Sequence, residues 1–285
     1  MKEIIIIALF TSGILYSCAK QEPYTASDFT DSLFTAGIEG PMYYKDGNIY
    51  AVNYEKEGTI GLVKPDGKCE LFVELPSGSI GNGIRFDSRG NMLIADYAKH
   101  NVLKLDMKTR KISVYAHDSS MNQPNDLAIM KNDIVFCSDP SWKNGTGKLW
   151  RINRDGTTSL LMNNIGTTNG IEVSPDNKFL YVNESVQRKV WRYDLNEKGD
   201  VLNKTLFFSF EDGGLDGMKC DAQGNLYIAR YDKGSLVKIS PDGFLLKEIK
   251  LKGKKPTNLT FGGKDMKTVF VTLQDRGLFE KFEVK

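Results

Sequence analysis

Histidine is scarce in this chain. Its 285 residues include only two histidines, His100 and His117, and neither lies in a pattern typical of a Ser-His-Asp triad. The motif GxSxG is absent, and no GxGxxG leads from a strand into a helix. The sequence therefore disfavours a nucleophile-elbow hydrolase and a dinucleotide-binding enzyme.

Cysteine is rare, and charge of one sign is not in excess. Of the four cysteines, Cys18 belongs to the N-terminal signal described below, which leaves Cys69, Cys137 and Cys220. Three is an odd number for an exported protein, so a disulfide framework is not expected. The net charge is +2, from 38 basic and 36 acidic residues, and the basic run that stands out is GKKP at 253–256. The chain is therefore not expected to bind nucleic acid.

A long hydrophobic run is also missing. The apolar segment Ile4–Leu15 follows Lys2 and is too short to span a bilayer as a helix. It ends in LYSC, which resembles a bacterial lipobox. We predict a signal peptide over 1–17, lipidation at Cys18 and a tether over 18–27; the alternative is an ordinary signal peptide with an incidental cysteine. Under both alternatives we expect an exported protein. If it is a lipoprotein, it would lie in the periplasm, at the outer membrane or at the cell surface, and would contact the membrane through its lipid anchor alone.

Six similar segments recur along the chain at intervals of 42 to 47 residues. Each has a polar residue, an apolar strand, a turn and a second apolar strand, as in NGIRFDSRGNMLIAD and DGMKCDAQGNLYIAR. A second hairpin pattern follows, which makes four short strands per repeat. A four-stranded repeat of this length is typical of a propeller blade. The sequence predicts an all-β fold, a six-bladed β-propeller over residues 28–285.

The two ends of this domain complement each other. The last repeat offers a single strand after its first pair, GLFEKFEVK, and the segment DFTDSLFTA before the first repeat can supply the missing strand. Pairing of the N- and C-terminal strands in one blade would remove exposed sheet edges. We therefore expect the chain ends to close the ring, whereas an all-β sandwich would not explain the near-equal repeats.

The residue that opens each repeat carries a side-chain oxygen. The innermost strands of a propeller surround its central channel, so these residues are expected to converge at one mouth. They are Glu39, Asn82, Asn125, Asn169, Asp216 and Asn258. Carboxylate and amide oxygens without His or Cys favour Ca²⁺, with Mg²⁺ or Mn²⁺ as alternatives, over Zn²⁺ or Cu²⁺. A structural alternative is that the amides only satisfy backbone groups at strand ends, most readily at Asn82 and Asn258.

A second set of positions, 14 or 15 residues later in each repeat, should lie at the same mouth but farther from the axis. It consists of Asn53, Asp96, Asp139, Glu184, Arg230 and Leu273. Asp139, Glu184 and Arg230 are candidates for substrate contact. So are Tyr97, Trp142 and Tyr231 in the neighbouring loops, which could stack against a sugar ring or an acyl chain. The alternative is a polar network that only ties the blades together.

Five motifs in order resemble the gluconolactonase and regucalcin (senescence marker protein) family of six-bladed propellers, to which diisopropylfluorophosphatase is related. They are IEGPMYY, QPNDLAI, FCSDP, TTNGIEVSPDNKFLYV and LDGMKCDAQGNLYIA. The match runs from about Glu39 to Tyr231. The resemblance implies a Ca²⁺-type cation held by Glu39, Asn169 and Asp216. It also places Asn125 in the same site, in contact with the metal or the substrate.

One position departs from the animal members of that family. They carry Arg two residues before the Asn that Asn125 matches, where this chain has Gln123. A charged contact to substrate hydroxyls is then missing, which weakens the expectation of a glucono- or gulonolactone. Bacterial members have motifs closer to QPNDLAI, so Gln123 is compatible with the family and stays a candidate for substrate contact.

These observations favour a calcium-dependent hydrolase of lactones, with sugar lactones as the default substrate. A metal can polarise an ester carbonyl and a neighbouring carboxylate can take a proton from water; the resemblance suggests Asp216 for that base. A phosphotriester or activated-ester hydrolase with the same metal site is one alternative. A non-catalytic, metal-organised ligand-binding propeller is another. We expect a monomer whose partner is a small-molecule substrate.

Overall fold

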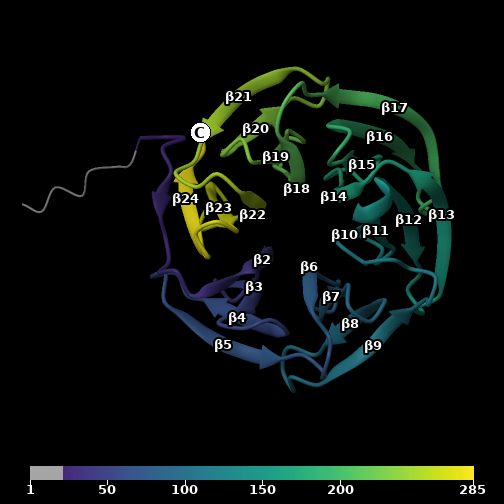
Figure 1. Ribbon diagram of the computed structural model, residues 1–285, viewed down its shortest axis with the longest axis horizontal. Coiled ribbons are helices and arrows are strands. Elements are labelled where there is room, and N and C mark those ends of the chain that lie inside the picture. The colour runs from purple at the N-terminus through teal and green to yellow at the C-terminus, as the bar shows by residue number, and fades with distance from the viewer. Residues whose placement is uncertain (1–21) are drawn as a thin grey trace, which may run out of the picture.

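Six four-stranded antiparallel sheets surround a central axis (Figure 1). The computed structural model describes residues 22–285, and within this range it contains strands β1 to β24 and one 3₁₀ turn, η1 (Trp142–Asn144). None of the described segments forms a helix long and apolar enough to cross a bilayer. The predicted six-bladed propeller is confirmed.

Each blade presents four strands from the axis outward. The innermost strands are β2 (Phe34–Tyr43), β6 (Gly81–Phe86), β10 (Leu127–Ile129), β14 (Thr168–Val173), β18 (Gly214–Cys220) and β22 (Pro256–Gly262). The second strands are β3 (Ile49–Tyr54), β7 (Met92–Asp96), β11 (Val135–Ser141), β15 (Phe179–Glu184), β19 (Leu226–Tyr231) and β23 (Thr268–Leu273). The third strands are β4 (Thr59–Val63), β8 (Asn101–Leu105), β12 (Thr146–Ile152), β16 (Lys189–Leu195), β20 (Ser235–Ile239) and β24 (Leu278–Glu283). The outermost strands are β5 (Cys69–Glu74), β9 (Ile112–His117), β13 (Thr158–Ile165), β17 (Val201–Ser209), β21 (Leu245–Lys250) and β1 (Ser27–Asp28).

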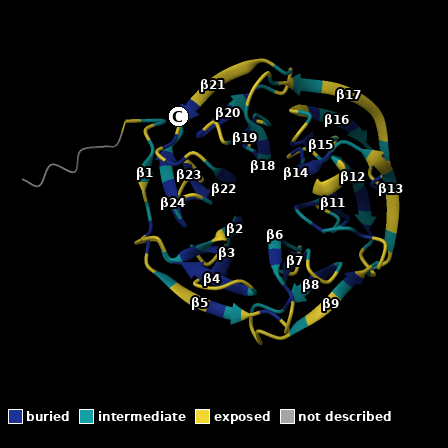
Figure 2. Ribbon diagram, in the orientation of Figure 1, coloured by how far each residue is buried: buried dark blue, intermediate teal, exposed yellow. Residues whose placement is uncertain are grey.

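The hydrophobic core lies between neighbouring blades. Middle strands such as β3 and β7 are buried along their whole length, which explains why they are apolar on both faces. Val52 of blade 1 and Ile84 of blade 2, for example, belong to one buried cluster between these blades. The outermost strands are the exposed ones (Figure 2). Stacking of blades therefore stabilises each sheet, as the repeat architecture requires.

The two chain ends close the ring, as expected. In the last blade, β1 pairs with β24 through Ser27 with Lys281 and Asp28 with Glu280. Upstream of β1, the Tyr24 ring lies 6.4 Å from that of Phe282, centroid to centroid. The outer edge of the last blade is thus built from the opposite end of the chain.

The N-terminal predictions are only partly within reach of the structure. The signal peptide over 1–17 and the lipidation site at Cys18 lie outside the described residues. Of the tether expected over 18–27, the last residues already contact the propeller: the backbone NH of Tyr24 donates to the carbonyl of Glu283 at 2.8 Å. The propeller contacts therefore begin a few residues earlier than the predicted boundary at 28.

Deleting residues 22–30 tests the contribution of ring closure. The deletion exposes β24 as an open edge and removes the packing of Tyr24 on Phe282 and of Phe29 on Phe270. Burial of one large apolar side chain is worth about 1.5–3 kcal/mol, so we expect the free energy of unfolding to fall by about 3–6 kcal/mol. Chemical denaturation of the chain with and without these residues measures this, and an unchanged midpoint would contradict it.

Candidate metal and active site

A cavity of about 300 Å³ opens at one mouth of the channel. We call it the mouth cavity. Its lining includes Glu39 from β2, Asn169 from β14 and Asp216 from β18, with Asn125 from the segment just before β10. Asn82 of β6 also lines it. The structure therefore brings together all four residues that the sequence assigned to the metal.

Backbone irregularities aim these side chains at the axis. In five blades the innermost strand departs from regular pairing around the ring residue, for example between Thr168 and Ile171 on either side of Asn169. In the sixth, Asn125 precedes the paired part of β10. A β-bulge re-aims a side chain and increases the local twist. The polar side chain thereby leaves the strand alternation, and five of the six ring residues, all except Asn258, line the mouth cavity.

Close approach between blades explains the residue that follows the ring position. A Cβ added at Gly217 would lie 1.9 Å from Cγ of Asn258 in the next blade, so only glycine fits there. A Cβ at Gly170 would lie 2.3 Å from the backbone oxygen of Asp216. The NG and DG pairs that open the repeats are thus needed for packing at the axis, beside the polar residue that forms the site.

Two amide oxygens in the mouth cavity have no hydrogen-bond partner. Oδ1 of Asn125 and Oδ1 of Asn169 are both buried and unpaired. The amide nitrogen of Asn169, in contrast, has a hydrogen-bond partner, because it donates to the backbone oxygen of Leu215 at 3.4 Å. An unpaired buried acceptor is costly, and a cation is a partner that would satisfy two such oxygens at once. These orphaned atoms fit a metal site.

The two carboxylates of the cavity lack a compensating charge. Among residues 22–285, no Lys, Arg or His forms an ion pair with Glu39 or Asp216. Burial and the nearby charge of Asp126 raise the pKa of Glu39 to about 8. Burial and the charges of Glu39 and Asp126 also raise the pKa of Asp216 well above its ordinary value. A divalent cation beside them would offset both shifts, because a positive charge favours the ionised carboxylates.

Beneath this pair lies a charged layer that is balanced within itself. Nη1 of Arg85 lies 3.3 Å from Oδ1 of Asp126, and Nη2 lies 3.2 Å from Oε2 of Glu172. Nζ of Lys219 lies 3.6 Å from the same Glu172 oxygen. Two cations and two anions cancel, so this layer offers no positive charge to spare for the mouth cavity. The two uncompensated carboxylates match the charge of one divalent ion.

The donor set is mixed rather than purely acidic. Within the described part of the chain, no group of three or more His, Cys, Asp and Glu side chains is placed to hold a metal. The candidate site has two carboxylates, Glu39 and Asp216, and two amides, Asn125 and Asn169. All four donors are hard oxygens, which suits Ca²⁺ or Mg²⁺ and disfavours Zn²⁺.

Asn258 has a larger role than satisfying backbone groups. Its Nδ2 donates to Oε1 of Glu39 at 3.0 Å and to Oδ2 of Asp126 at 3.3 Å. Its Oδ1 accepts from the backbone NH of Leu259 at 2.9 Å, which fixes the amide orientation. Asn258 therefore positions a candidate metal ligand. Asn82 follows the simpler expectation, because its Nδ2 donates to the backbone oxygen of Asn125 at 3.1 Å.

Most of the second set of positions fixes loops. The Asp139 carboxylate is fully buried and accepts hydrogen bonds from the backbone NH groups of Asn122 and Gln123 at 2.6–3.0 Å. It also accepts one from Nε1 of Trp150 at 2.8 Å. Glu184 likewise accepts from the backbone NH of Gly166 at 3.1 Å. These contacts hold the segments that enter the innermost strands and support the alternative of a structural network.

The remaining predicted substrate residues also lie outside the mouth cavity. Gln123, Asp139, Glu184, Arg230 and Tyr97 are all missing from the described residues that line it. The Arg230 guanidinium stacks 3.7 Å from the Phe210 ring centroid and pairs with Asp212 at 3.0 Å, so packing explains this side chain.

Trp142 and Tyr231, two of the three aromatic residues expected at the mouth, do line the cavity. Three further polar residues that line it were not predicted: Thr257, Ser185 and Gln274. Trp142 on η1 is 45% exposed, and Tyr231 donates a hydrogen bond to Oε1 of Gln274. The aromatic loop residues Trp142 and Tyr231 are detectable in the sequence, whereas nothing in the sequence around Gln274 marks it.

Comparison with known proteins finds relatives that cover most of the chain. Residues 38–275 match the model of the SMP-30/gluconolactonase/LRE-like region. A gluconolactonase from Zymomonas mobilis is 28% identical over 82% of this chain and 75% of its own length. A pentonolactonase from Haloferax volcanii is 30% identical over 82% of this chain and 80% of its own length. The solved structure of regucalcin, a calcium-binding protein from Agrobacterium tumefaciens, superposes with a TM-score of 0.78 over 89% of this chain and 92% of its own, at 22% identity, which shows the shared fold.

The raised pKa values predict a pH-dependent stability of the metal-free protein. Glu39 has a pKa of about 8 when folded against 4.5 as its ordinary value, so the folded state holds a proton that the unfolded state releases between these values. The free energy of unfolding should therefore fall as pH rises from about 5 to 8, by about 1.4 kcal/mol per pH unit for each such proton. Ca²⁺ should accordingly raise Tm more at pH 8 than at pH 5.

Thermal melts at several pH values, with chelator and with Ca²⁺, measure this dependence. The double variant Glu39→Gln/Asp216→Asn is the control, because it lacks both carboxylates and should lose the slope that they cause. A slope shared by the wild type and the double variant would assign the pH dependence to other groups.

Asn258→Ala should weaken metal binding about tenfold or more, because residues that orient a ligand contribute about 10–100-fold to affinity. The variant leaves Oε1 of Glu39 without its amide donor. Isothermal titration with Ca²⁺ measures the loss, and Asn196→Ala, in an exposed turn, is the matched control. Equal affinity of Asn258→Ala and the wild type would show that Glu39 needs no such support.

Proposed function

The chain belongs to the SMP-30/gluconolactonase/LRE-like family, and from this membership and the mouth cavity we propose that it is a calcium-dependent lactonase acting on small sugar lactones. The observation that carries the proposal is the convergence of two uncompensated carboxylates and two unpaired amide oxygens in one cavity. The lactonases of Zymomonas mobilis and Haloferax volcanii support the reaction class, since both align with most of this chain.

Calcium is the proposed metal because of the donor chemistry. Glu39, Asn125, Asn169 and Asp216 would hold the ion through oxygens alone, and Ca²⁺ accepts six to eight oxygen ligands in flexible geometry. The cavity leaves room for water or substrate oxygens beside these four side chains. When bound, the ion would polarise the lactone carbonyl and stabilise negative charge on its oxygen.

The size and walls of the cavity favour a compact substrate. A volume of about 300 Å³ lies at the lower end of small-molecule sites, so a single sugar ring fits better than a long acyl chain. Trp142 and Tyr231 offer aromatic surface for the ring, and Gln274 and Ser185 offer groups for its hydroxyls. The cavity residues, rather than Gln123 or Asp139, are therefore the proposed source of substrate specificity.

The residues of the chain divide the work of hydrolysis. Asp216 takes a proton from a water molecule as the water oxygen bonds to the carbonyl carbon. The ring C–O bond then breaks, the ring oxygen takes up a proton, and a hydroxy acid leaves. The Asn169 amide beside Asp216 favours the ionised form of its carboxylate and so lowers its pKa, against the effect of burial. Asn125 orients the substrate, and Glu39 serves as a ligand that Asn258 holds.

A proton-release assay with the purified protein tests the proposal. D-glucono-1,5-lactone, an aliphatic lactone and a phosphotriester are each assayed with chelator and again after Ca²⁺ is restored. We expect turnover of the sugar lactone that chelation removes and Ca²⁺ returns. Faster phosphotriester turnover would favour the activated-ester alternative, and tight Ca²⁺ binding without any turnover would favour a ligand-binding propeller.

Asp216→Asn should lower kcat/KM about 10²–10⁴-fold while the fold is retained, since a positioned general base contributes about that much. Asp242→Asn is the matched control, because Asp242 is an exposed carboxylate in a turn remote from the mouth cavity. Circular dichroism verifies the fold of both variants. Near-normal turnover of Asp216→Asn would refute its assignment as the base.

A further inference from the structure

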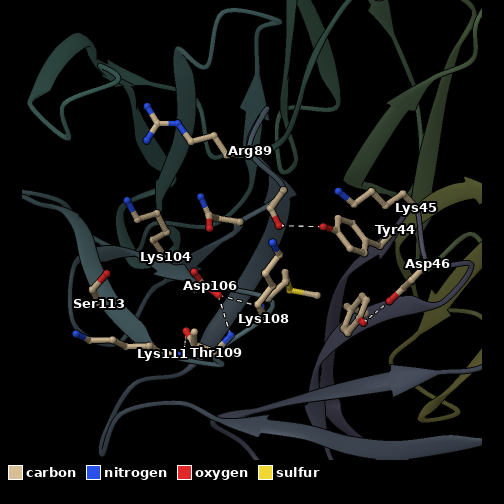
Figure 3. A pocket seen from close by; sticks show the side chains of 14 residues that line it. Tyr44, Lys45, Asp46, Arg89, Lys104, Asp106, Lys108, Thr109, Lys111 and Ser113 are labelled. Atoms are coloured by element: carbon tan, nitrogen blue, oxygen red, sulfur yellow. Dashed lines mark hydrogen bonds between the residues drawn. The ribbon is translucent and has the colours of Figure 1, made fainter.

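A second, larger groove lies on the opposite face of the propeller, between blades 1 and 2. Its volume is about 810 Å³. It is lined by hairpin turns: residues 44–46 between β2 and β3, residues 89–91 between β6 and β7, and residues 106–109 between β8 and β9. These turns lie at the strand ends away from the mouth cavity. The hydroxyl of Tyr44 donates to the carbonyl of Gly90 at 3.1 Å and joins the two blades across the groove (Figure 3).

Positive charge dominates this lining. The lining contains five cationic side chains but only two carboxylates. The cations are Lys45, Arg89, Lys104, Lys108 and Lys111 (Figure 3). Within residues 22–285, none of the five forms an ion pair. By contrast, other exposed lysines of blade 1 are paired: Lys56 with Glu74, Lys64 with Glu70 and Lys68 with Asp66.

The two carboxylates of the groove are already occupied by neutral donors. Asp106 accepts from the backbone NH groups of Lys108 and Thr109 at 2.9 and 2.8 Å. Asp46 accepts from the backbone NH of Asn48 at 2.9 Å and from the hydroxyl of Tyr50 at 2.8 Å. The carboxylates therefore serve the turns. Lys45 and Lys104 lie over the rings of Tyr44 and Tyr115, but these rings carry no charge, so the charges of the five cations remain available to an anionic ligand.

Five like charges in one concave surface repel one another, and a concave surface strengthens their field at its centre. The chain as a whole carries a net charge of only +2, so the groove concentrates charge that the rest of the surface balances. Its volume exceeds that of a single sulfate or phosphate and falls in the range of ligand sites. An anion with several charges would reach more than one of the surrounding cations.

We propose that this groove between blades 1 and 2 binds a small multivalent anion, one that carries at least two carboxylate, sulfate or phosphate groups. The site is separate from the mouth cavity and does not depend on the lactonase function. Arg89 offers the planar fork that suits such groups, and Lys104, which is half-buried, is the cation best placed to lose its water on binding.

Isothermal titration of the wild-type protein with three probes tests the proposal. The probes are trigalacturonate, a sulfated disaccharide and tripolyphosphate, at about 0.15 M ionic strength so that weak long-range attraction is screened. We expect a dissociation constant below about 1 mM for at least one of them. The probe that binds most tightly identifies whether carboxylate, sulfate or phosphate is the preferred group. Failure of all three to bind at this ionic strength would overturn the proposal.

Charge-matched variants separate a site from general attraction. Arg89→Gln/Lys104→Gln/Lys111→Gln removes three cations from the groove, and Lys131→Gln/Lys198→Gln/Lys264→Gln removes three exposed lysines elsewhere. We expect the groove variant to bind the best probe at least tenfold more weakly and the control less than twofold. Equal losses in both would overturn the proposal, because net charge alone would then explain binding.

Thermal stability gives a second readout that does not depend on the heat of binding. A ligand that binds only the folded state raises Tm. The best probe should therefore raise Tm of the wild type and of the control variant, and should leave Tm of the groove variant unchanged. A Tm increase that persists in the groove variant would place the anion elsewhere and refute the site.

Discussion

The centre of this protein is governed by two carboxylates that have no counter-charge. Glu39 and Asp216 lie at the mouth of a closed channel, above a layer of charges that already cancel. Their mutual repulsion and partial dehydration raise the free energy of the metal-free folded state. A bound cation would offset this cost. The unpaired amide oxygens of Asn125 and Asn169 incur a similar cost for the same reason. The four side chains are therefore arranged as the proposed cation would require, at a cost to the stability of the metal-free protein.

Closure of the ring is what holds this arrangement together. Glu39 belongs to the first blade and Asn258 to the last, 219 residues apart, and a hydrogen bond joins them directly. β1 and β24 fasten the same two ends at the rim, so the outer pairing and the inner contact depend on each other. A proposed metal ligand thus lies at the seam between the first and last blades. Stability of the seam and geometry of the site should change together, although they are separated by the full width of a blade.

The sequence predicts the ring of polar residues well because a repeat places equivalent residues at equivalent points. Six near-equal steps were enough to bring Glu39, Asn169 and Asp216 to one mouth. Repeat position alone does not reveal contacts between blades: Asp126, the residue after a ring position, accepts a hydrogen bond from the Asn258 amide at 3.3 Å, and Asn258 reaches Glu39 only across the closed ring. Asp139 belongs to the second set of positions, where substrate contact was expected. Its carboxylate instead accepts hydrogen bonds from backbone NH groups, which no sequence pattern predicts.

Charge was the least predictable property. The net charge of +2 and the lack of a long basic run predicted no nucleic-acid-binding face, and neither revealed local clusters: two carboxylates meet in the mouth cavity and five cations line the groove between blades 1 and 2. Two of the groove cations, Lys108 and Lys111, lie three positions apart in the sequence. Lys45 and Arg89 come close to them only because blades 1 and 2 pack together. The balanced layer in the channel lies beneath the mouth cavity, and its four charges sum to zero. The two proposed sites open on opposite faces of the propeller, so a cation at one and an anion at the other would interact across the depth of the blades, where dissolved salt screens their attraction.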